Sequence, residues 1–255
     1  MNRIIKFIVL DILKNKIVLV YTAILSILSW SVFSLEDNST KGLLTLLNVI
    51  LLTVPLISVV FSTIYIYNSS EFIELLLSQP IKRSKIWWSL FFGLTLSLLL
   101  SFFIGTGIPI LFYAPSDVGI MMLLVGFFIT TVFVAIAFLS SILTRDKAKG
   151  IGIAIMLWLF FALLFDGIVL FLLFQLSDYP IEKMMVGITA FNPIDLARIL
   201  ILLHLDVSAM MGYTGAIFKD FFGTSIGIFI AFIILFLWII VPFLVSLIKF
   251  NRKDL

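Results

Sequence analysis

The chain has 255 residues, of which 62% are hydrophobic and 12% charged, and its mean hydropathy is +1.26. A water-soluble domain of that composition would expose large apolar patches and aggregate, so the composition excludes a soluble globular protein. The formal net charge of +3 is spread over short basic clusters, which argues against nucleic acid as a partner, and the absence of cysteine excludes disulfides and thiolate metal sites.

Six apolar runs are long enough to cross a bilayer, which takes about 20 helical residues. They are residues 17–35, 43–67, 87–113, 120–143, 150–176 and 223–247. The runs are continuous rather than alternating in polarity, which predicts helices and not barrel strands. The predicted fold class is therefore an all-α integral membrane protein with six transmembrane helices, forming a single domain over residues 1–255.

The basic residues of the connecting segments predict the orientation, because cytoplasmic loops carry an excess of Lys and Arg. Four basic residues, Lys41, Lys183, Arg198 and Lys219, fall on one side, and the other 13 of the 17 fall on the opposite side with both ends of the chain. We therefore expect both termini in the cytoplasm.

Before the first crossing, residues 1–14 predict an amphipathic helix that lies along the cytoplasmic interface. Asn2, Arg3, Lys6, Asp11 and Lys14 share one arc, and Ile4, Ile5, Ile8 and Ile12 lie opposite. The alternative, a cytosolic extension of the first crossing, is less favoured because Asn15 and Lys16 interrupt the apolar run.

The segment between crossings two and three, residues 68–86, predicts a short cytoplasmic helix. Asn68 is the expected cap and Glu71 the third position, Phe72, Ile73 and Leu76 share an apolar face, and Pro80 ends the helix. Spacing alone leaves open whether this helix only turns the chain at the headgroups or docks a cytoplasmic partner.

Asp166 is the one charged residue inside a predicted crossing. A carboxylate at that depth costs about 3 kcal/mol on insertion scales, so it should not face lipid. We favour a residue that fixes helix packing over a proton or substrate site, because the crossings contain no second charge to act as a relay partner.

The external segment, residues 177–222, predicts two short helices that are too apolar for water and too short to cross. Asn192 as cap, Pro193 at the first position and Asp195 at the third begin the first helix, which should run to His204. Asp206 should cap a second helix over residues 207–219. Such pairs dip into the outer leaflet, as re-entrant helices do, or pack against a partner.

No catalytic residue is predicted. The chain contains no phosphate-binding loop of the G-x-x-x-x-G-K-[ST] type, so any ATPase is a separate chain, and with one histidine we expect no enzyme. His204, Met210 and Met211, with Met184 and Met185, are weak candidates for copper ligands, because methionine in an apolar segment is usually a packing residue.

The order of these elements resembles the type-2 (exporter-type) ABC permeases. Residues 71–84, EFIELLLSQPIKRS, and 192–218, NPIDLARILILLHLDVSAMMGYTGAIF, more narrowly resemble the NosY-type permeases of the nitrous-oxide-reductase maturation system. The resemblance implies a homodimer in the bacterial cytoplasmic (inner) membrane that binds a cytoplasmic NosF-like ATPase, which holds ATP and Mg²⁺. It also implies a periplasmic NosD-like protein, with the copper chaperone NosL nearby and copper as cargo of the wider system; no cofactor is expected on this chain.

The same resemblance implies two docking surfaces. The ATPase would dock on a coupling helix formed by Ser69, Ser70, Glu71, Phe72, Ile73, Glu74, Leu75, Leu76, Leu77, Ser78 and Gln79. The periplasmic partner would dock on Asn192, Pro193, Asp195, Arg198, His204, Asp206, Met210, Met211 and Tyr213. The function expected is a membrane subunit that couples ATP hydrolysis to copper-centre assembly.

Three alternatives remain open from the residues. The chain could be a general exporter-type permease for a lipid, drug or glycan, a secondary transporter driven by protons through Asp166, or a structural membrane scaffold.

Overall fold

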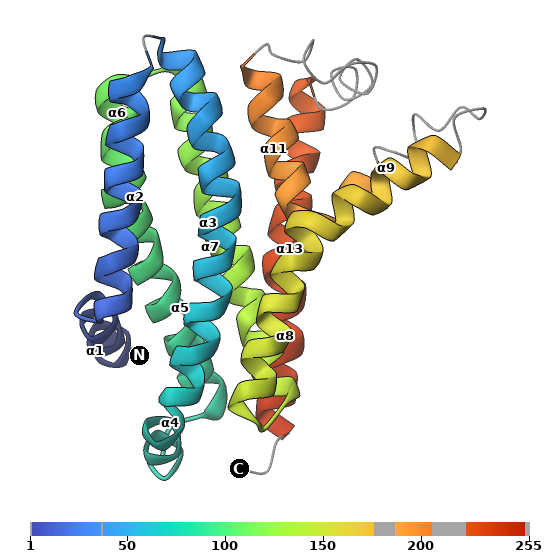
Figure 1. Ribbon diagram of the computed structural model, residues 1–255. Helices are drawn as coiled ribbons and strands as arrows, with labels where there is room; N and C mark the ends of the chain where they lie inside the picture. The colour runs from blue at the N-terminus through green and yellow to red at the C-terminus, as the bar shows by residue number, and fades with distance from the viewer. Residues whose placement is uncertain (1, 37, 176–186, 206–222, 253–255) are drawn as a thin grey trace.

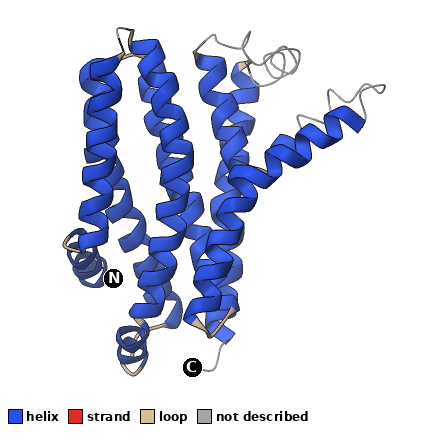
Figure 2. Cartoon of the chain, viewed as in Figure 1, coloured by secondary structure: helices blue, strands red, loops and turns tan. Residues whose placement is uncertain are grey.

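The computed structural model describes residues 2–36, 38–175, 187–205 and 223–252, and the regular structure of these residues is helical (Figure 2). Six stretches are long and apolar enough to span a membrane, which confirms the predicted number. They are Lys16–Leu35, Ser39–Asn68, Arg83–Tyr113, Asp117–Leu143, Lys147–Leu172 and Ser225–Arg252. The chain is thus a multi-pass membrane protein.

The first five spans begin one to four residues before the predicted runs, because polar residues that start a helix lie outside its apolar stretch. Asn15 and Asn38 accept hydrogen bonds from the backbone N–H of Ile17 and Thr40, each at 2.9 Å. Ser116 and Asp146 cap the fourth and fifth spans in the same way.

Two of the spans are interrupted by a π-helical turn. The third consists of α5 (Arg83–Phe102), η1 (Phe103–Gly107) and α6 (Ile108–Tyr113), and the fifth of α8 (Lys147–Leu159), η2 (Phe160–Leu164) and α9 (Phe165–Gln175). The remaining elements are α1 (Asn2–Leu13), α2 (Lys16–Leu35), α3 (Ser39–Asn68), α4 (Ser70–Leu77), α7 (Asp117–Leu143), α11 (Pro193–His204) and α13 (Ser225–Arg252).

The start of α1 and the end of α13 lie at the same end of the bundle, together with α4 and the α7–α8 connection (Figure 1). We call this the α4 end, and the opposite end, where α6 meets the start of α7, the α6 end. The two ends of a chain that crosses six times must emerge on one side, and the structure has that arrangement. Which side is cytoplasmic stays a prediction.

Helix α7 forms the centre of the molecule and packs against α3, α5, α8, α11 and α13. Its most apolar stretch is 72% buried, whereas the stretches of Lys147–Leu172 and Ser225–Arg252 are only 17% and 22% buried. Beyond η2, α9 turns away from the other helices (Figure 1). The bundle therefore has a packed centre and one helix arm that leaves it.

The first helix is amphipathic, as predicted, and is separate from α2. Ile8 and Ile12 are fully buried, while Lys6, Asp11 and Lys14 are exposed. α1 packs on α5, where a Cβ atom at Gly93 would come within 2.5 Å of the Ile8 side chain. A glycine at this position is what allows the two helices to approach so closely.

Candidate functional site

Helix α4 is a short surface helix at the α4 end. Ile73 and Leu76 are buried, Phe72 is half-buried and lies 5.5 Å from the Phe7 ring, and Leu75 is 66% exposed. Glu71 and Glu74 are exposed on the same helix. The predicted apolar face is confirmed, and the outer face presents two carboxylates around one leucine.

The predicted cap of this helix is wrong. Asn68 is the last residue of α3, and Ser69 takes the capping position of α4 without a side-chain hydrogen bond. Asn68 belongs to α3, and its side-chain oxygen accepts a hydrogen bond from Lys147 Nζ at 2.6 Å instead of capping α4.

Polar contacts tie the root of α4 to the α7–α8 connection. The Tyr67 hydroxyl lies 2.7 Å from the Thr144 hydroxyl and donates to the carbonyl oxygens of Ser141 and Thr144, each at 3.2 Å. A Cβ atom at Gly150, on α8, would meet this hydroxyl at 2.2 Å. The end of α3, the end of α7 and the start of α8 therefore form one braced unit beneath α4.

A recess of about 300 Å³ opens beside this unit. Helices α3, α4, α5, α7 and α13 contribute to its walls, and its lining includes Tyr67, Ser70, Glu74, Trp87, Arg145 and Phe250. Its walls are mainly apolar, with Glu74 and Arg145 as charged groups of opposite sign. The recess is thus shaped for an apolar group that carries a polar end.

Helix α11 begins as the sequence predicts. Asn192 Oδ1 accepts from the backbone N–H of Ile194 at 3.0 Å, Pro193 follows at the first position, and Asp195 lies in the first turn. The helix itself is packed inside the bundle against α3, α7, α13 and η2, with seven buried residues. The sequence predicts that the external helices dip into the outer leaflet or pack against a partner; the structure shows α11 packed against other segments of its own chain.

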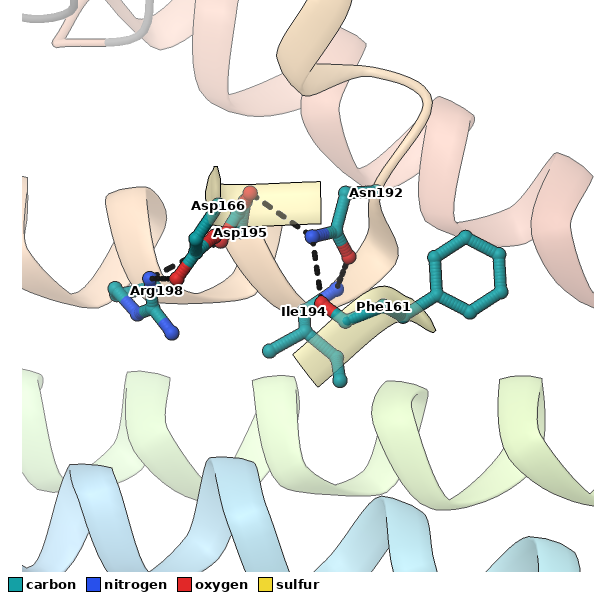
Figure 3. Close-up of polar contacts among 6 residues, drawn as sticks. All are labelled: Phe161, Asp166, Asn192, Ile194, Asp195 and Arg198. Atoms are coloured by element: carbon teal, nitrogen blue, oxygen red, sulfur yellow. Dashed lines mark hydrogen bonds and ion pairs between the residues drawn. The ribbon is translucent and has the colours of Figure 1, made fainter. Parts of the chain in front are cut away.

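The start of α11 lies against the π-helical turn η2. Asn192, fully buried, donates from Nδ2 to the Phe161 carbonyl oxygen at 2.9 Å and to Asp195 Oδ2 at 2.9 Å (Figure 3). Asn192 therefore caps α11 and also donates a hydrogen bond to a carbonyl oxygen of the π-helical turn.

One turn further along α11, Arg198 joins two carboxylates. Its Nη1 donates to Asp166 Oδ2 of α9 at 3.0 Å and to Asp195 Oδ1 at 3.1 Å (Figure 3). The Asp195 side chain is 15% exposed, and those of Arg198 and Asp166 are 32% and 37% exposed. We call these four residues, Asp166, Asn192, Asp195 and Arg198, the charge cluster.

The electrostatics of this cluster favour a protonated acid. Burial, the largest cause, and the neighbouring Asp166 carboxylate together raise the pKa of Asp195 from 3.8 to about 7, although the Arg198 guanidinium and the hydrogen bond from Asn192 act in the opposite direction. The helix dipole at the first turn of α11 also opposes protonation, because it favours negative charge. The acid that the sequence places in a helix start is therefore poised to titrate near neutral pH.

Asp166 has a charged partner from outside the six spans, which the sequence does not predict. Arg198 was assigned to an external segment, but α11 returns into the bundle and brings its guanidinium to the first turn of α9. The pattern Asp195-x-x-Arg198 on one helix face gives a signal for their mutual pair. The pair with Asp166 depends on a tertiary contact that spacing does not encode.

The predicted partner-docking residues divide into four groups. Asn192 and Pro193 are buried, so in this conformation they cannot touch a partner, and Asp195 and Arg198 are half-buried in the charge cluster. His204 is exposed at the end of α11. Asp206, Met210, Met211 and Tyr213 lie outside the described residues, as do the second external helix and the pair Met184 and Met185.

A family model described as ABC-2 family transporter protein matches residues 14–255, which include all six spans. The chain belongs to the ABC-2 transporter family. This ABC-2 chain is also similar to "Probable ABC transporter permease protein NosY" of Pseudomonas aeruginosa, with 31% identity over 148 residues. The match covers 54% of each protein, so the chain spans about half the length of the curated relative it matches. It is an ABC transporter permease.

Proposed function

We propose that this permease is the membrane subunit of an ABC complex that transmits ATP hydrolysis by a separate cytoplasmic ATPase to a periplasmic partner. The observation that carries the proposal is a continuous line of contacts from α4 to α11. Tyr67 and Asn68 tie the root of α4 to the α7–α8 connection, and α7 packs against both α3 and α11.

The ATPase docks on the outer face of α4 and beside it. Glu71, Glu74 and Leu75 are exposed on this helix, and the recess next to it offers apolar walls with Glu74 and Arg145. A side chain of the ATPase that enters the recess would lie against the braced unit, so a displacement there would reach α3 and α7 together. The α4 end is then cytoplasmic, as the basic residues indicate.

The test of this docking is co-purification. Glu71→Lys with Glu74→Lys should abolish recovery of the ATPase with the tagged permease, whereas Asp117→Lys, an exposed acid at the other end of the bundle, should leave recovery unchanged. Equal recovery in both variants would contradict the proposal and favour a structural scaffold.

The similarity to NosY supports a role in assembling the copper centres of nitrous oxide reductase. In this role a periplasmic NosD-like protein binds at the α6 end, near His204, and NosL and the reductase act in the same system. Deletion of the gene in a denitrifying bacterium should leave the purified reductase without copper in its catalytic cluster. Full copper occupancy would contradict this role and leave a general exporter-type permease.

The working unit is a homodimer in the bacterial inner membrane. The apolar stretch of Ser225–Arg252 is only 22% buried within one chain, and that of Lys147–Leu172 only 17%, which leaves helix surface for a second copy as well as for lipid. Native mass spectrometry of the purified complex should give two permease chains with two ATPase chains. A single permease chain per complex would contradict the dimer.

A further inference from the structure

The charge cluster contains one more negative group than its cation can balance. Asp166 and Asp195 both accept hydrogen bonds from the same nitrogen, Nη1 of Arg198, at 3.0 and 3.1 Å. With both acids ionised, the cluster would carry a net negative charge beside the apolar centre of the bundle. Two carboxylates that share a site of this kind raise the affinity of one of them for a proton.

We propose that Asp166 and Asp195 form a proton-binding site, and that a proton bound there holds α9 against α11. Asp195 carries the proton, because it is the less exposed of the two acids. A neutral Asp195 hydrogen-bonds with Asp166 and leaves the Arg198 guanidinium to pair with Asp166. An ionised Asp195 competes for that guanidinium and repels Asp166, which weakens the link between the two helices.

The position of Asp166 makes this link consequential. It lies in the first turn of α9, immediately after the π-helical turn η2, where the fifth span leaves the bundle (Figure 1). Apart from η2, no other described element packs extensively against α9. A change in one ion pair at the base of this helix can therefore change the angle at which the whole helix leaves the bundle.

No other described charge faces the site from the surrounding helices. α3, α7 and α13 carry Lys41, Asp117, Lys249 and Arg252, and all four are exposed in the first or last turn of their helix. On α11 itself the remaining titratable group is His204, exposed at the far end. Among the described residues, the two acids are therefore the groups whose protonation can change the contact between α9 and α11.

The direction of the response follows from linkage. The pKa of Asp195 is about 7 in the closed arrangement and would fall towards the ordinary value of about 4 once the carboxyl is solvated. The closed arrangement thus binds more protons between these two values, and opening becomes easier as pH rises. Release of one proton allows the opening constant to increase up to about tenfold per pH unit in this window.

The experiment measures the distance between α9 and α11 in the permease alone, without an ATPase. Because the chain has no cysteine, Phe171→Cys with His204→Cys places two spin labels at exposed positions of these helices. The second substitution also removes the one histidine, so no imidazole titrates. Pulsed electron paramagnetic resonance in lipid nanodiscs then gives the distance distribution at pH 5.5 and pH 8.5.

A short, narrow distribution at pH 5.5 that lengthens or broadens at pH 8.5 supports the proposal. Asp195→Asn, which resembles the protonated acid, should keep the short distribution at both pH values, and the control Asp117→Asn should respond to pH like the parent. Asp166→Asn should give a broad distance distribution at both pH values. If this variant does not fold, the comparison of Asp195→Asn with the parent still tests the proposal.

Identical distributions at the two pH values in the parent, or an unchanged response in Asp195→Asn, would overturn the proposal. Neither outcome bears on the docking of an ATPase at α4, so this inference and the proposed function can fail separately.

Discussion

The two short helices that interrupt the six spans, α4 and α11, look alike in sequence but occupy opposite settings. Each follows a span and has an acid in its first turn, yet α4 lies on the surface with Glu71, Glu74 and Leu75 exposed, while α11 is packed among α3, α7, α13 and η2. The comparison shows that a short apolar helix can serve either as a surface for a partner or as an internal part of the bundle. Changes in α11 should therefore cost stability, and changes in α4 should cost binding.

The largest effect on stability is expected for Arg198→Met, which leaves Asp166 and Asp195 without their cation. Removing one partner of a buried ion pair costs about 3 to 5 kcal/mol, and partial solvent access at this site reduces the cost to about 2 kcal/mol. Denaturant unfolding in detergent should show the loss. Arg198→Lys, which keeps the charge, should lose less; equal unfolding midpoints for all three proteins would contradict a structural role of the cluster.

Asn192→Ala should have the next largest effect, because it removes a helix cap and also the partner of the buried Phe161 carbonyl. We expect a loss of about 1.5 kcal/mol in the free energy of unfolding. Asn38→Ala is the matched control: Asn38 caps α3 with the same geometry but is exposed, so its loss should be about 1 kcal/mol or less. If the two variants lose the same free energy of unfolding, the burial of the start of α11 does not add to the stability that the cap provides.

Tyr67→Phe probes the brace beneath α4. The change removes the hydroxyl that contacts Ser141 and Thr144, and should cost about 1 kcal/mol of stability. Because the brace joins α4 to α7, the variant should bind the ATPase normally and yet show reduced dependence of ATP hydrolysis on the permease. Tyr113→Phe, at an exposed position of α6, should leave both measurements unchanged.

The smallest effect on stability is expected at Leu75. Leu75→Ser alters a side chain that is 66% exposed, so the free energy of unfolding should change by no more than about 0.5 kcal/mol. Recovery of the ATPase should nevertheless fall. Ile73→Ser, on the buried face of the same helix, should instead destabilise the permease. A larger loss of stability in Leu75→Ser than in Ile73→Ser would contradict the assignment of α4 as a surface helix with one exposed, partner-binding face.

The six spans and the start of α11 are predictable from the sequence because their determinants are local. Long apolar runs define the spans, and the succession Asn192, Pro193 and Asp195 defines a helix start wherever the helix lies. The cap of α4 is not predictable in this way, since Asn68 suits either the end of one helix or the start of the next. Which of these two roles Asn68 takes depends on how far α3 continues.

The charge cluster and the π-helical turns require the tertiary structure. The fifth span is apolar on all sides around residues 160–164, so its sequence carries no periodic signal for a change of helix type. Arg198 lies 32 residues from Asp166 in sequence, and their contact depends on the path that returns α11 into the bundle. A sequence without an alignment does not specify that path.

The π-helical turn η2 also sets the rotational register of the span that contains it. Each residue of an α-helix turns the chain by about 100°, and each residue of a π-helical turn by less, because its hydrogen bonds run from residue i to i+5. Conversion of Phe160–Leu164 to a regular α-helix of the same length would therefore rotate the side chains of α9 relative to α8 and turn Asp166 away from Arg198, although length and hydropathy of the span would not change. Deletion of one residue from this turn compensates for that rotation, so it should be tolerated better than insertion of one.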